Sequence, residues 1–287
     1  MAIEGRRFRG IPVLFLAAGR RMQMAQMFQE RGFEIFSYES DLTSPIAQRV
    51  SVIESTLPWS DPNFMDEVFP VCMENNIELI IPFQDNAVQA ASRLGGYLRS
   101  KGTQSQAVCS TKRIAEICYD KSSFALWMVE HFPGLYPSVI DGSPMVAKPK
   151  YGAGSKTIYH IDDELDFERY KPYINSKKWI TQRKIKGTEY SVDCYFDLIG
   201  DYVDSVPRRR LIMGSSGEVI KSITERNVQL QAISKKVGER LGLKGPANMQ
   251  YIVEDKTTRI YLFEINARFG GGYTLSIQAG MDAINLI

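Results

Sequence analysis

The sequence predicts a parallel α/β domain followed by a mainly antiparallel α+β domain. In the first third of the 287 residues, apolar strand-like runs alternate with amphipathic helical segments, which is the pattern of a parallel sheet covered by helices. From about residue 110 onward, strand-like runs follow one another across short turns, as they do in antiparallel sheets. We therefore expect one domain over residues 1–109 and a second over residues 110–287.

The first domain is expected to contain three strand–helix units. Strands are expected at 11–19, 33–40 and 77–83, and helices at 20–32, 61–76 and 85–102. Asp61 and Pro62 would supply the N-cap and the first residue of the second helix. Ligands bind beyond the carboxyl ends of the strands in such sheets, and the residues at those ends are Gly19, Arg20, Glu39, Asp41, Gln84 and Asp85. We take Gly19, Arg20 and Asp85 as candidate substrate-binding residues.

The second domain is expected to begin with one helix over residues 110–132, which Phe132-Pro133-Gly134 ends. The expected elements that follow are strands around a glycine-rich loop at 144–161, further strands at 179–210, a helix at 227–243, and two strands at 248–255 and 259–266. Residues 279–287 are typical of the start of a helix, so either the protein is short or the chain is truncated.

The composition excludes several classes of function. The formal charge of +2, from 35 basic and 33 acidic residues, gives no reason to expect a nucleic acid or an anionic membrane as a partner. No run approaches the ~20 apolar residues of a membrane span. The N-terminus resembles a signal peptide, but its short apolar run is better interpreted as a first β-strand. Four scattered cysteines without a CxxC are expected to be reduced thiols of a cytoplasmic protein.

The segment 260-IYLFEINARFGG-271 combines a strand with polar groups at its end. Residues two apart on a strand share a face, so Glu264 and Asn266 would lie side by side while Ile265 enters the core. Gln250, on the preceding strand, adds a third oxygen. Because the chain has only two histidines, a metal site would use oxygen ligands of the kind that suit Mg²⁺ or Mn²⁺. Arg268 follows, where it could hold a phosphate. Taken alone, this pattern is also that of a polar strand end meeting solvent.

Two earlier segments contain groups suited to a nucleotide. In 146-VAKPKYGAGSK-156, Lys148 lies on a strand before a glycine-rich loop whose backbone could cradle phosphates. The segment is not a Walker A loop, because no G-K-[ST] precedes a helix. In 179-WITQRKIKGTEYSVD-193, the backbone could line an adenine and Glu189 could accept from ribose hydroxyls. An ordinary hairpin and an amphipathic strand are the alternatives. The first domain lacks the glycines of a dinucleotide fingerprint, which argues against a nicotinamide-dependent dehydrogenase.

The order and spacing of these segments along the chain resemble those of the ATP-grasp superfamily. The resemblance is to the branch similar to the carbamoyl-phosphate synthetase large chain and other carboxylate–amine ligases. The matching segments are DKSSF at 120–124, VAKPKYGAGSK at 146–156, QRKIKGTEYSVD at 182–193, NMQYIV at 248–253 and FEINARFGGG at 263–272. LAAG, SYESD and IIPFQD in the first domain resemble the family's preceding α/β domain. The resemblance implies a Rossmann-like pre-ATP-grasp domain, then an ATP-grasp domain with a lid subdomain at about 136–182.

The resemblance also implies roles for individual residues. The ATP phosphates would contact Lys112 or Lys121 and, above all, Lys148, and the lid loop would comprise Tyr151, Gly152, Gly154, Ser155 and Lys156. The adenine would be bordered by Gln182, Lys184 and Ile185, and the ribose by Glu189. The family often has an acidic residue at the position of Gln182. One or two divalent ions would be held by Gln250, Glu264 and Asn266, and Arg268 would stabilise the transferring phosphoryl group.

The arginine-rich strand 206-VPRRRLIMG-214 and the strand after it would lie near the acceptor end of such a site. Arg208, Arg210 and Lys221 are candidates to hold a substrate carboxylate or the phosphate. Only some of three adjacent arginines can face inward on a strand, and a solvated charge cluster is the alternative.

The implied activity is an ATP-dependent ligation with Mg²⁺. A small-molecule carboxylate would be phosphorylated, and an amine would then displace phosphate from the acyl phosphate. A bicarbonate-activating or carbamoyl-phosphate-forming enzyme and an inactive nucleotide-binding module are the alternatives. The family also allows a homodimer. The identities of the carboxylate and the amine are not specified by these motifs.

Overall fold

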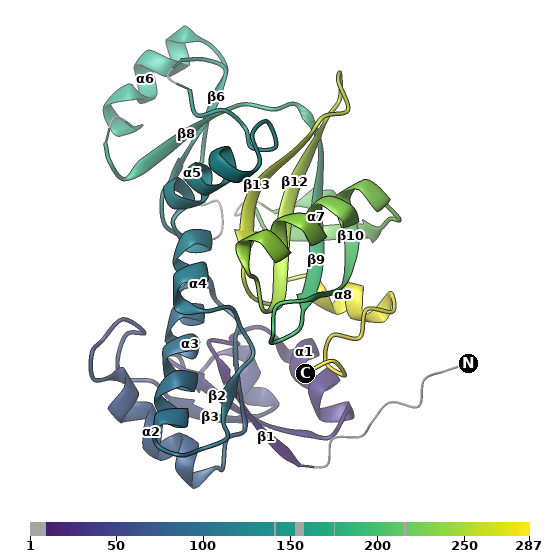
Figure 1. Cartoon of the computed structure of the whole chain (residues 1–287). Coiled ribbons are helices and arrows are strands. Elements are labelled where there is room, and N and C mark those ends of the chain that lie inside the picture. The colour runs from purple at the N-terminus through teal and green to yellow at the C-terminus, as the bar shows by residue number, and fades with distance from the viewer. Residues whose placement is uncertain (1–9, 141, 153–157, 175, 215–216) are drawn as a thin grey trace.

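The computed structural model describes residues 10–140, 142–152, 158–174, 176–214 and 217–287. Its first sheet is parallel and has the strand order β3-β2-β1-β4-β5. The strands are β1 (Ile11–Leu16), β2 (Phe33–Glu39), β3 (Ser51–Glu54), β4 (Leu79–Pro82) and β5 (Gln106–Ala107). The helices are α1 (Met22–Glu30), α2 (Phe64–Glu74) and α3 (Asp85–Ser100), with a 3₁₀ turn at Pro45–Gln48. This part forms the lower half of the molecule in Figure 1.

Burial on both faces explains the continuous apolar run of β1. Val13 and Phe15 enter one core cluster, whereas Leu14 and Leu16 enter another on the opposite face of the sheet. The strand order reverses direction between β1 and β4. A crevice forms outside the carboxyl ends of two such strands, where ligands bind in doubly wound sheets.

Two features of this domain differ from the sequence-based expectation. The short strands β3 and β5 were not predicted, because four and two residues give too little periodicity. The expected N-cap was wrong: α2 begins at Phe64 after Asn63, while the Asp61 carboxylate accepts from the Asn63 amide at 2.8 Å in the preceding turn.

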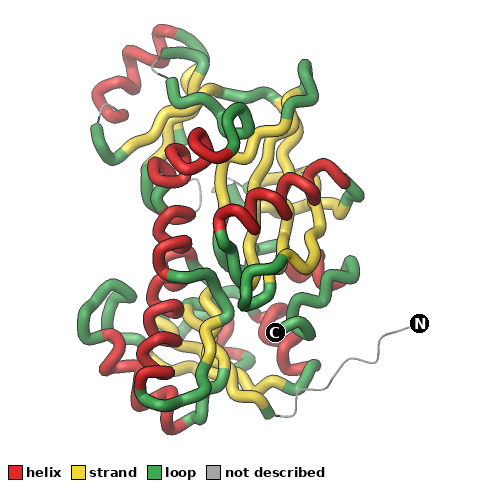
Figure 2. Tube along the Cα trace, viewed as in Figure 1, coloured by secondary structure: helices red, strands yellow, loops and turns green. Residues whose placement is uncertain are grey.

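Two helices, α4 (Lys112–Tyr119) and α5 (Lys121–His131), connect the parallel sheet to the rest of the chain. They replace the single helix expected at 110–132. Asp120 breaks it, because its carboxylate accepts from the backbone amides of Ser122 at 2.8 Å and Ser123 at 3.3 Å and so caps α5. Figure 2 shows these helices between the two halves of the molecule.

The second large sheet is antiparallel, with the order β11-β10-β9-β12-β13. Its strands are β9 (Gly187–Phe196), β10 (Tyr202–Met213), β11 (Val219–Thr224), β12 (Gly245–Glu254) and β13 (Ile260–Asn266). Helix α7 (Val228–Leu241) packs across one face through Leu230 and Val237, and the short α8 (Tyr273–Gln278) follows β13 (Figure 1). The expected helix start at 279–287 was wrong, since the helical turn precedes these residues.

A small sheet with the order β7-β6-β8 forms a separate unit at the top of Figure 1. It comprises β6 (Met145–Pro149), β7 (Tyr159–Ile161) and β8 (Trp179–Arg183), with the helix α6 (Glu164–Ile174). A core cluster of its own includes Met145, Ala147 and Phe167. Helix α6 was not predicted, because the polar segment around it contains Pro172 and little apolar periodicity. The bounds of 136–182 for a lid, and the boundary between residues 109 and 110, stay predictions.

None of the helices in the described part of the chain is long and apolar enough to cross a membrane.

Packing between α7 and β9 allows a test of this fold. A Cβ on Gly238 would lie 2.0 Å from Cζ of the buried Phe196 ring, so Gly238→Ala should overpack the core. We expect a loss of about 1–3 kcal/mol of unfolding free energy. The matched control is Gly96→Ala in α3, where a Cβ meets nothing within 4 Å. This substitution should raise the unfolding free energy by about 0.5–1 kcal/mol. Urea midpoints measure both, and equal midpoints for the two variants would contradict the packing described.

Candidate functional site

The floor of the candidate site is the pairing of β12 with β13. In this register Gln250 lies opposite Glu264, and Asn248 lies opposite Asn266. Glu264 is half-buried, while Asn266 is only 4% exposed. The Glu264 carboxylate makes no hydrogen bond or ion pair to any other described residue, although its charge acts on Lys148 and Arg210. A strand end thus presents a carboxylate whose oxygens are available to a ligand.

Two buried lysines from different elements lie near one another, and Lys148 is close to this carboxylate. Lys148 on β6 is 5% exposed, and its Nζ lies 3.5 Å from the carbonyl oxygen of Phe263 and 5.3 Å from the centre of that ring. Burial lowers the pKa of Lys148 to about 8, an effect that Glu264 opposes and Lys121 strengthens. Lys121, at the start of α5, is 8% exposed and donates from Nζ to the Gly152 carbonyl at 2.8 Å. Two buried ammonium groups whose charges repel one another, one of them close to a carboxylate, are suited to bind a polyanion.

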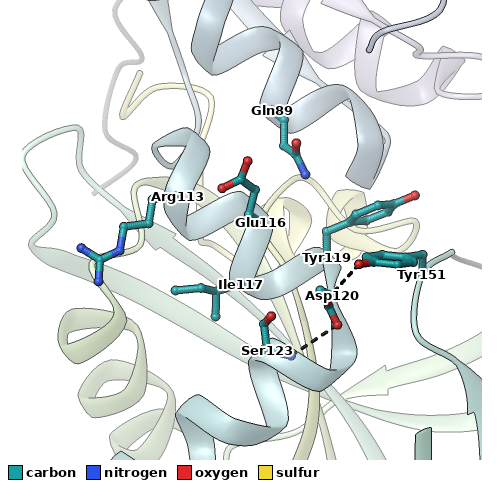
Figure 3. A pocket seen from close by; sticks show the side chains of 8 residues that line it. All are labelled: Gln89, Arg113, Glu116, Ile117, Tyr119, Asp120, Ser123 and Tyr151. Carbon is teal, nitrogen blue, oxygen red and sulfur yellow. Dashed lines mark hydrogen bonds between the residues drawn. The ribbon is translucent and has the colours of Figure 1, made fainter. Parts of the chain in front are cut away.

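The start of the predicted lid loop is attached to α5. The Tyr151 hydroxyl donates to the Asp120 carboxylate at 3.0 Å, and the Tyr151 ring lies 5.6 Å from that of Tyr119. These groups border an open pocket of about 320 Å³ (Figure 3). Gly152 has φ +111°, which only glycine adopts readily. Gly154, Ser155 and Lys156 lie outside the described residues.

The residues expected around the adenine and ribose have different surroundings. Gln182 is buried and interacts with the Tyr136 hydroxyl, but its Nε2 makes no well-aligned hydrogen bond in the described part of the chain. Ile185 is half-buried. Lys184 instead forms an ion pair with Asp162 at 2.7 Å, and Glu189 accepts from Arg210 at 3.0 Å. The unpaired amide donor of Gln182 is the feature here that a nucleotide base could satisfy.

The three arginines of β10 divide between the two faces of the sheet. Arg209 forms a half-exposed ion pair with Glu225 at 3.1 Å. Arg210 lies on the opposite face, where it donates to Ser191 at 2.9 Å and to Glu189. Burial lowers the pKa of Arg210, and Glu189 opposes that effect most strongly. The expectation that only some of these arginines face inward agrees with this arrangement.

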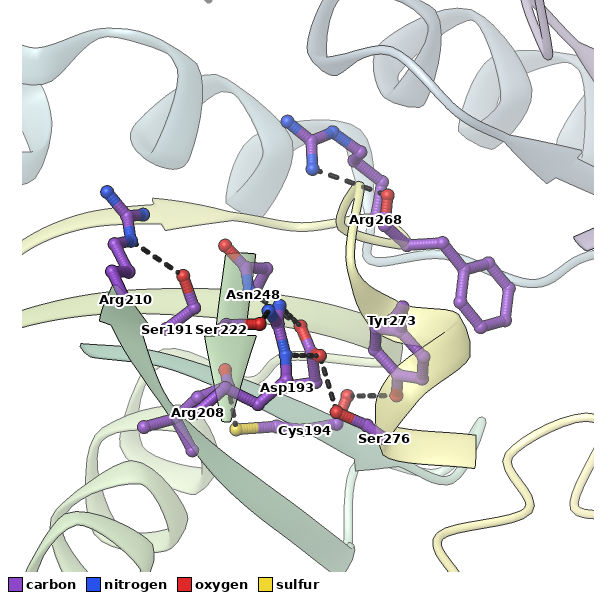
Figure 4. Close-up of polar contacts among 12 residues, drawn as sticks. Ser191, Asp193, Cys194, Arg208, Arg210, Ser222, Asn248, Arg268, Tyr273 and Ser276 are labelled. Atoms are coloured by element: carbon purple, nitrogen blue, oxygen red, sulfur yellow. Dashed lines mark hydrogen bonds and ion pairs between the residues drawn. The ribbon is translucent and has the colours of Figure 1, made fainter. Parts of the chain in front are cut away.

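Arg208 forms the most deeply buried ion pair of the site. Its Nε donates to Asp193 Oδ2 at 2.7 Å and its Nη2 to Oδ1 at 3.2 Å, and both side chains are at most 2% exposed. Asp193 also accepts from Ser276 Oγ and Asn248 Nδ2, each at 2.6 Å (Figure 4). Asp193 is not among the site residues predicted from the sequence. Its period-2 relation to Glu189 and Ser191, opposite an arginine-rich strand, is the signal that could have found it.

Arg268 joins the two halves of the molecule. Its Nη2 donates to Asp85 Oδ2 at 2.8 Å, at the carboxyl end of β4, and to Asn266 Oδ1 at 3.2 Å. The Arg268 Nε and Asn266 Nδ2 atoms are buried and have no hydrogen-bond partner among the described residues. Arg268 therefore lies beside the proposed metal ligands but contacts an aspartate of the first domain.

Four other candidates are not brought into this cluster. Lys112 is exposed on α4 and lies 3.6 Å from Glu116. Lys221 and Arg20 are exposed. Gly19, with φ +54°, lies in the turn after β1.

The donor set fits a hard divalent cation held in part by a nucleotide. The described residues contain no group of three or more His, Cys, Asp or Glu side chains that could hold a metal alone. Gln250, Glu264 and Asn266 offer one carboxylate and two amide oxygens. Mg²⁺ is commonly bound through one or two carboxylates together with substrate phosphates. The amide oxygen of Asn266 would have to turn from Arg268 to become a ligand.

Comparison with known proteins gives two family matches. Residues 175–287 match the model described as ATP-grasp in the biosynthetic pathway with Ter operon, and residues 13–104 match the PylC-like N-terminal domain. The carbamoyl phosphate synthase large chain of Caldanaerobacter subterraneus is 24% identical over 138 residues, which cover 44% of this chain and 13% of that protein. That of Clostridium botulinum is 24% identical over 224 residues, which cover 68% of this chain and 20% of that protein. The chain thus spans a fifth or less of these relatives.

Solved structures share the fold across nearly the whole chain. The biotin carboxylase domain of Hydrogenobacter thermophilus 2-oxoglutarate carboxylase, in complex with MgADP and bicarbonate, has a TM-score of 0.71 at 14% identity and covers 97% of this chain and 69% of that one. The L-amino acid ligase of Bacillus licheniformis has a TM-score of 0.69 at 16% identity, covering 97% and 73%. N5-carboxyaminoimidazole synthetase of Staphylococcus aureus, complexed with ADP, has a TM-score of 0.70 at 12% identity, covering 96% and 74%.

The buried ion pair of β9 and β10 has a structural role that can be tested. Asp193→Ala would leave the Arg208 guanidinium buried and unpaired, so we expect a loss of about 3–5 kcal/mol of unfolding free energy. Arg209→Ala, on the same strand but half-exposed, should cost about 1 kcal/mol or less. Thermal and urea unfolding of both variants measure the difference. Similar losses would show that the Arg208–Asp193 pair contributes no more than a surface pair.

Proposed function

We propose that this chain, an ATP-grasp protein by its family matches and its fold, is an ATP-dependent carboxylate–amine ligase that forms a C–N bond with release of ADP and phosphate. One observation above all supports the proposal. The unpaired carboxylate of Glu264 lies opposite Gln250 in the pairing of β12 with β13, and close to the buried ammonium group of Lys148, which Lys121 also affects. A carboxylate without a partner next to buried ammonium groups that make no ion pair is suited to a metal–nucleotide complex.

In this proposal the lysines and the strand-end oxygens hold the triphosphate from two sides. Lys148 and Lys121 neutralise phosphate charge, while Gln250, Glu264 and Asn266 face the divalent ion. Bound Mg²⁺, or Mn²⁺, would neutralise charge on the phosphate oxygens during transfer. The adenine end would be bordered by Gln182, Lys184 and Ile185, and the residues from Tyr151 to Lys156 would close over the phosphates.

The proposed reaction has two steps. A substrate carboxylate attacks the γ-phosphate, which gives an acyl phosphate and ADP. An amine then attacks the acyl carbon, and phosphate leaves. Positioning and charge neutralisation account for most of the catalysis of phosphoryl transfer, so no side-chain nucleophile is required. Arg268, now paired with Asp85, lies next to Asn266 and is placed to stabilise the transferring group.

The remaining assignments are part of the same proposal. The substrates would be small molecules, and a homodimer would be compatible with the fold, since one similar structure is a domain dimer. The four cysteines are free and buried, which suits a cytoplasmic protein. A bicarbonate-activating enzyme is the second candidate, because a biotin carboxylase domain with bound bicarbonate shares the fold.

Release of ADP from Mg–ATP tests the function. We expect release that requires both a carboxylate and an amine from a panel of pairs. Glu264→Gln should lower the rate by at least about 100-fold with an unchanged melting temperature, because it removes the site's unpaired carboxylate. Glu239→Gln, a surface change on α7, is the matched control. Release with bicarbonate alone would favour the second candidate. Tight ATP binding without turnover on any pair, or full activity of Glu264→Gln, would contradict the proposal.

The pH dependence of nucleotide binding tests the role of Lys148. Its pKa in the free protein is lowered to about 8, and nearby phosphates favour the charged form. The affinity for Mg–ADP should therefore be constant below about pH 8 and weaken above it, by up to about tenfold per pH unit. Calorimetric titration of the wild type and Lys148→Met should show that the variant binds weakly and loses this dependence. Lys235→Met on α7 should retain the pH dependence of Mg–ADP affinity. If the affinity of Lys148→Met fell above pH 8 as it does in the wild type, another group would be responsible for the pH dependence.

A further inference from the structure

Arg21 occupies the position in the first domain where a ligand is expected. It follows the carboxyl end of β1, whereas Asp85 follows that of the neighbouring strand β4, and the strand order reverses between them. The turn before Arg21 is fixed by the buried carboxylate of Glu39, which accepts from the backbone amides of Ala18 at 2.7 Å and Gly19 at 3.1 Å. Arg21 is therefore held at the crevice by backbone geometry.

The guanidinium of Arg21 points toward the glycine-rich segment after β13. A Cβ on Gly271 would lie 3.1 Å from Arg21 Nη1. Burial lowers the pKa of Arg21 to about 10, the positive charge of Arg268 adds to this effect, and Asp85 opposes it. Arg21 thus belongs to the same cluster as Arg268 but comes from the other domain.

The pairing of charges leaves Arg21 without a carboxylate of its own. Each of the other three arginines facing the site has one: Arg208 with Asp193, Arg210 with Glu189, and Arg268 with Asp85. The Arg21 guanidinium makes no ion pair or hydrogen bond to another described residue, and the Asp85 carboxylate near it is already bonded to Arg268. Among these four arginines, Arg21 can bind an anion without the loss of an existing pair.

We propose that Arg21 is a substrate-binding residue that holds an anionic group, a carboxylate or a phosphate, at the junction of α1 with the Gly270–Gly272 segment. The inference rests on the proposed function, because it takes the space beyond Arg268 to be the acceptor end of the site. It changes the earlier assignment of that role to Arg208 and Arg210, whose guanidinium groups are committed to carboxylates within the sheet.

The position of Arg21 indicates the class of substrate. Its charged neighbours are Arg268 and Asp85, not Lys148 or Glu264. It therefore lies beyond Arg268, away from the phosphate-binding lysines. The group bound at Arg21 is therefore different from the carboxylate that ATP activates. One of the two substrates, the acid or the amine, must contain an additional anionic group that does not react. Dicarboxylates, amino acids and phosphorylated acids contain such a group.

Anion titration of the full chain tests the proposal without a known substrate. Succinate, inorganic phosphate and the neutral succinamide are titrated at constant ionic strength with saturating Mg–ADP. We expect the wild type to bind at least one of the two anions but not succinamide, and the preferred anion distinguishes a carboxylate from a phosphate. Arg21→Gln should weaken binding at least about tenfold, and Arg21→Lys should retain part of it, since charge remains without the planar fork. Arg49→Gln, an exposed change in the same domain, should leave it unchanged.

The controls separate this inference from the function itself. Arg21→Gln should keep its melting temperature, since it removes an unpaired charge, and should bind Mg–ADP as the wild type does. Three results would overturn the proposal for Arg21. The wild type and Arg21→Gln could bind the anions equally, or the wild type could bind neither anion up to about 50 mM. Phosphate binding could also be lost in Lys148→Met but not in Arg21→Gln. Failure of the wild type to bind Mg–ADP would instead contradict the proposed function, and titration without nucleotide would still decide the role of Arg21.

Discussion

The buried carboxylate of Asp193 is the interaction on which the geometry of the site depends. It accepts from Arg208 of β10, Asn248 of β12 and Ser276 of α8, so one side chain of β9 fixes three other elements. Between these anchors runs the Gly270–Gly272 segment, which passes so close that a Cβ on Gly272 would lie 2.5 Å from Arg208 Nη1. Glycines are required there because the backbone must approach a guanidinium held in place by a buried ion pair.

This network divides the charged groups of the site into two kinds. Arg208 and Asp193 satisfy one another within the sheet, and their burial is tolerated because both are hydrogen-bonded. Glu264 and Arg21 are partly buried without a hydrogen bond or ion pair among the described residues, and buried Lys148 has only the Phe263 carbonyl, 3.5 Å from its Nζ. Such a state costs free energy in the absence of a ligand. Burial lowers the pKa of Lys148 to about 8, as expected for a charged group withdrawn from water. The second kind of group is the one that ligand binding would stabilise.

Residue pattern predicted the parallel and antiparallel sheets and the polar end of β13, but not β3, β5 or α6. The apolar run of β1 and the period-2 relation of Glu264 to Asn266 predicted a buried parallel strand and a polar strand end, because both depend on local periodicity. Asp193 was missed because its partners, Arg208, Asn248 and Ser276, come from other elements that only the fold brings beside β9. Arg20 was chosen over Arg21 for a different reason. Adjacent arginines at a strand end look alike in sequence, and the turn fixed by Glu39 decides which one enters the crevice.

The ion pair between Arg268 and Asp85 connects the end of β13 to the carboxyl end of β4. Arg268 extends from the end of β13, next to the proposed metal ligands, while Asp85 begins α3 at the carboxyl end of β4. Both side chains are mostly buried, so the contact replaces water at the domain junction. The proposed phosphate site at Lys148 and Glu264 is thereby linked, through Asn266 and Arg268, to the carboxyl end of β4. In the proposed ligase, an acceptor bound there would lie against Arg268, the residue proposed to stabilise the transferring phosphoryl group, and joining two substrates requires this proximity.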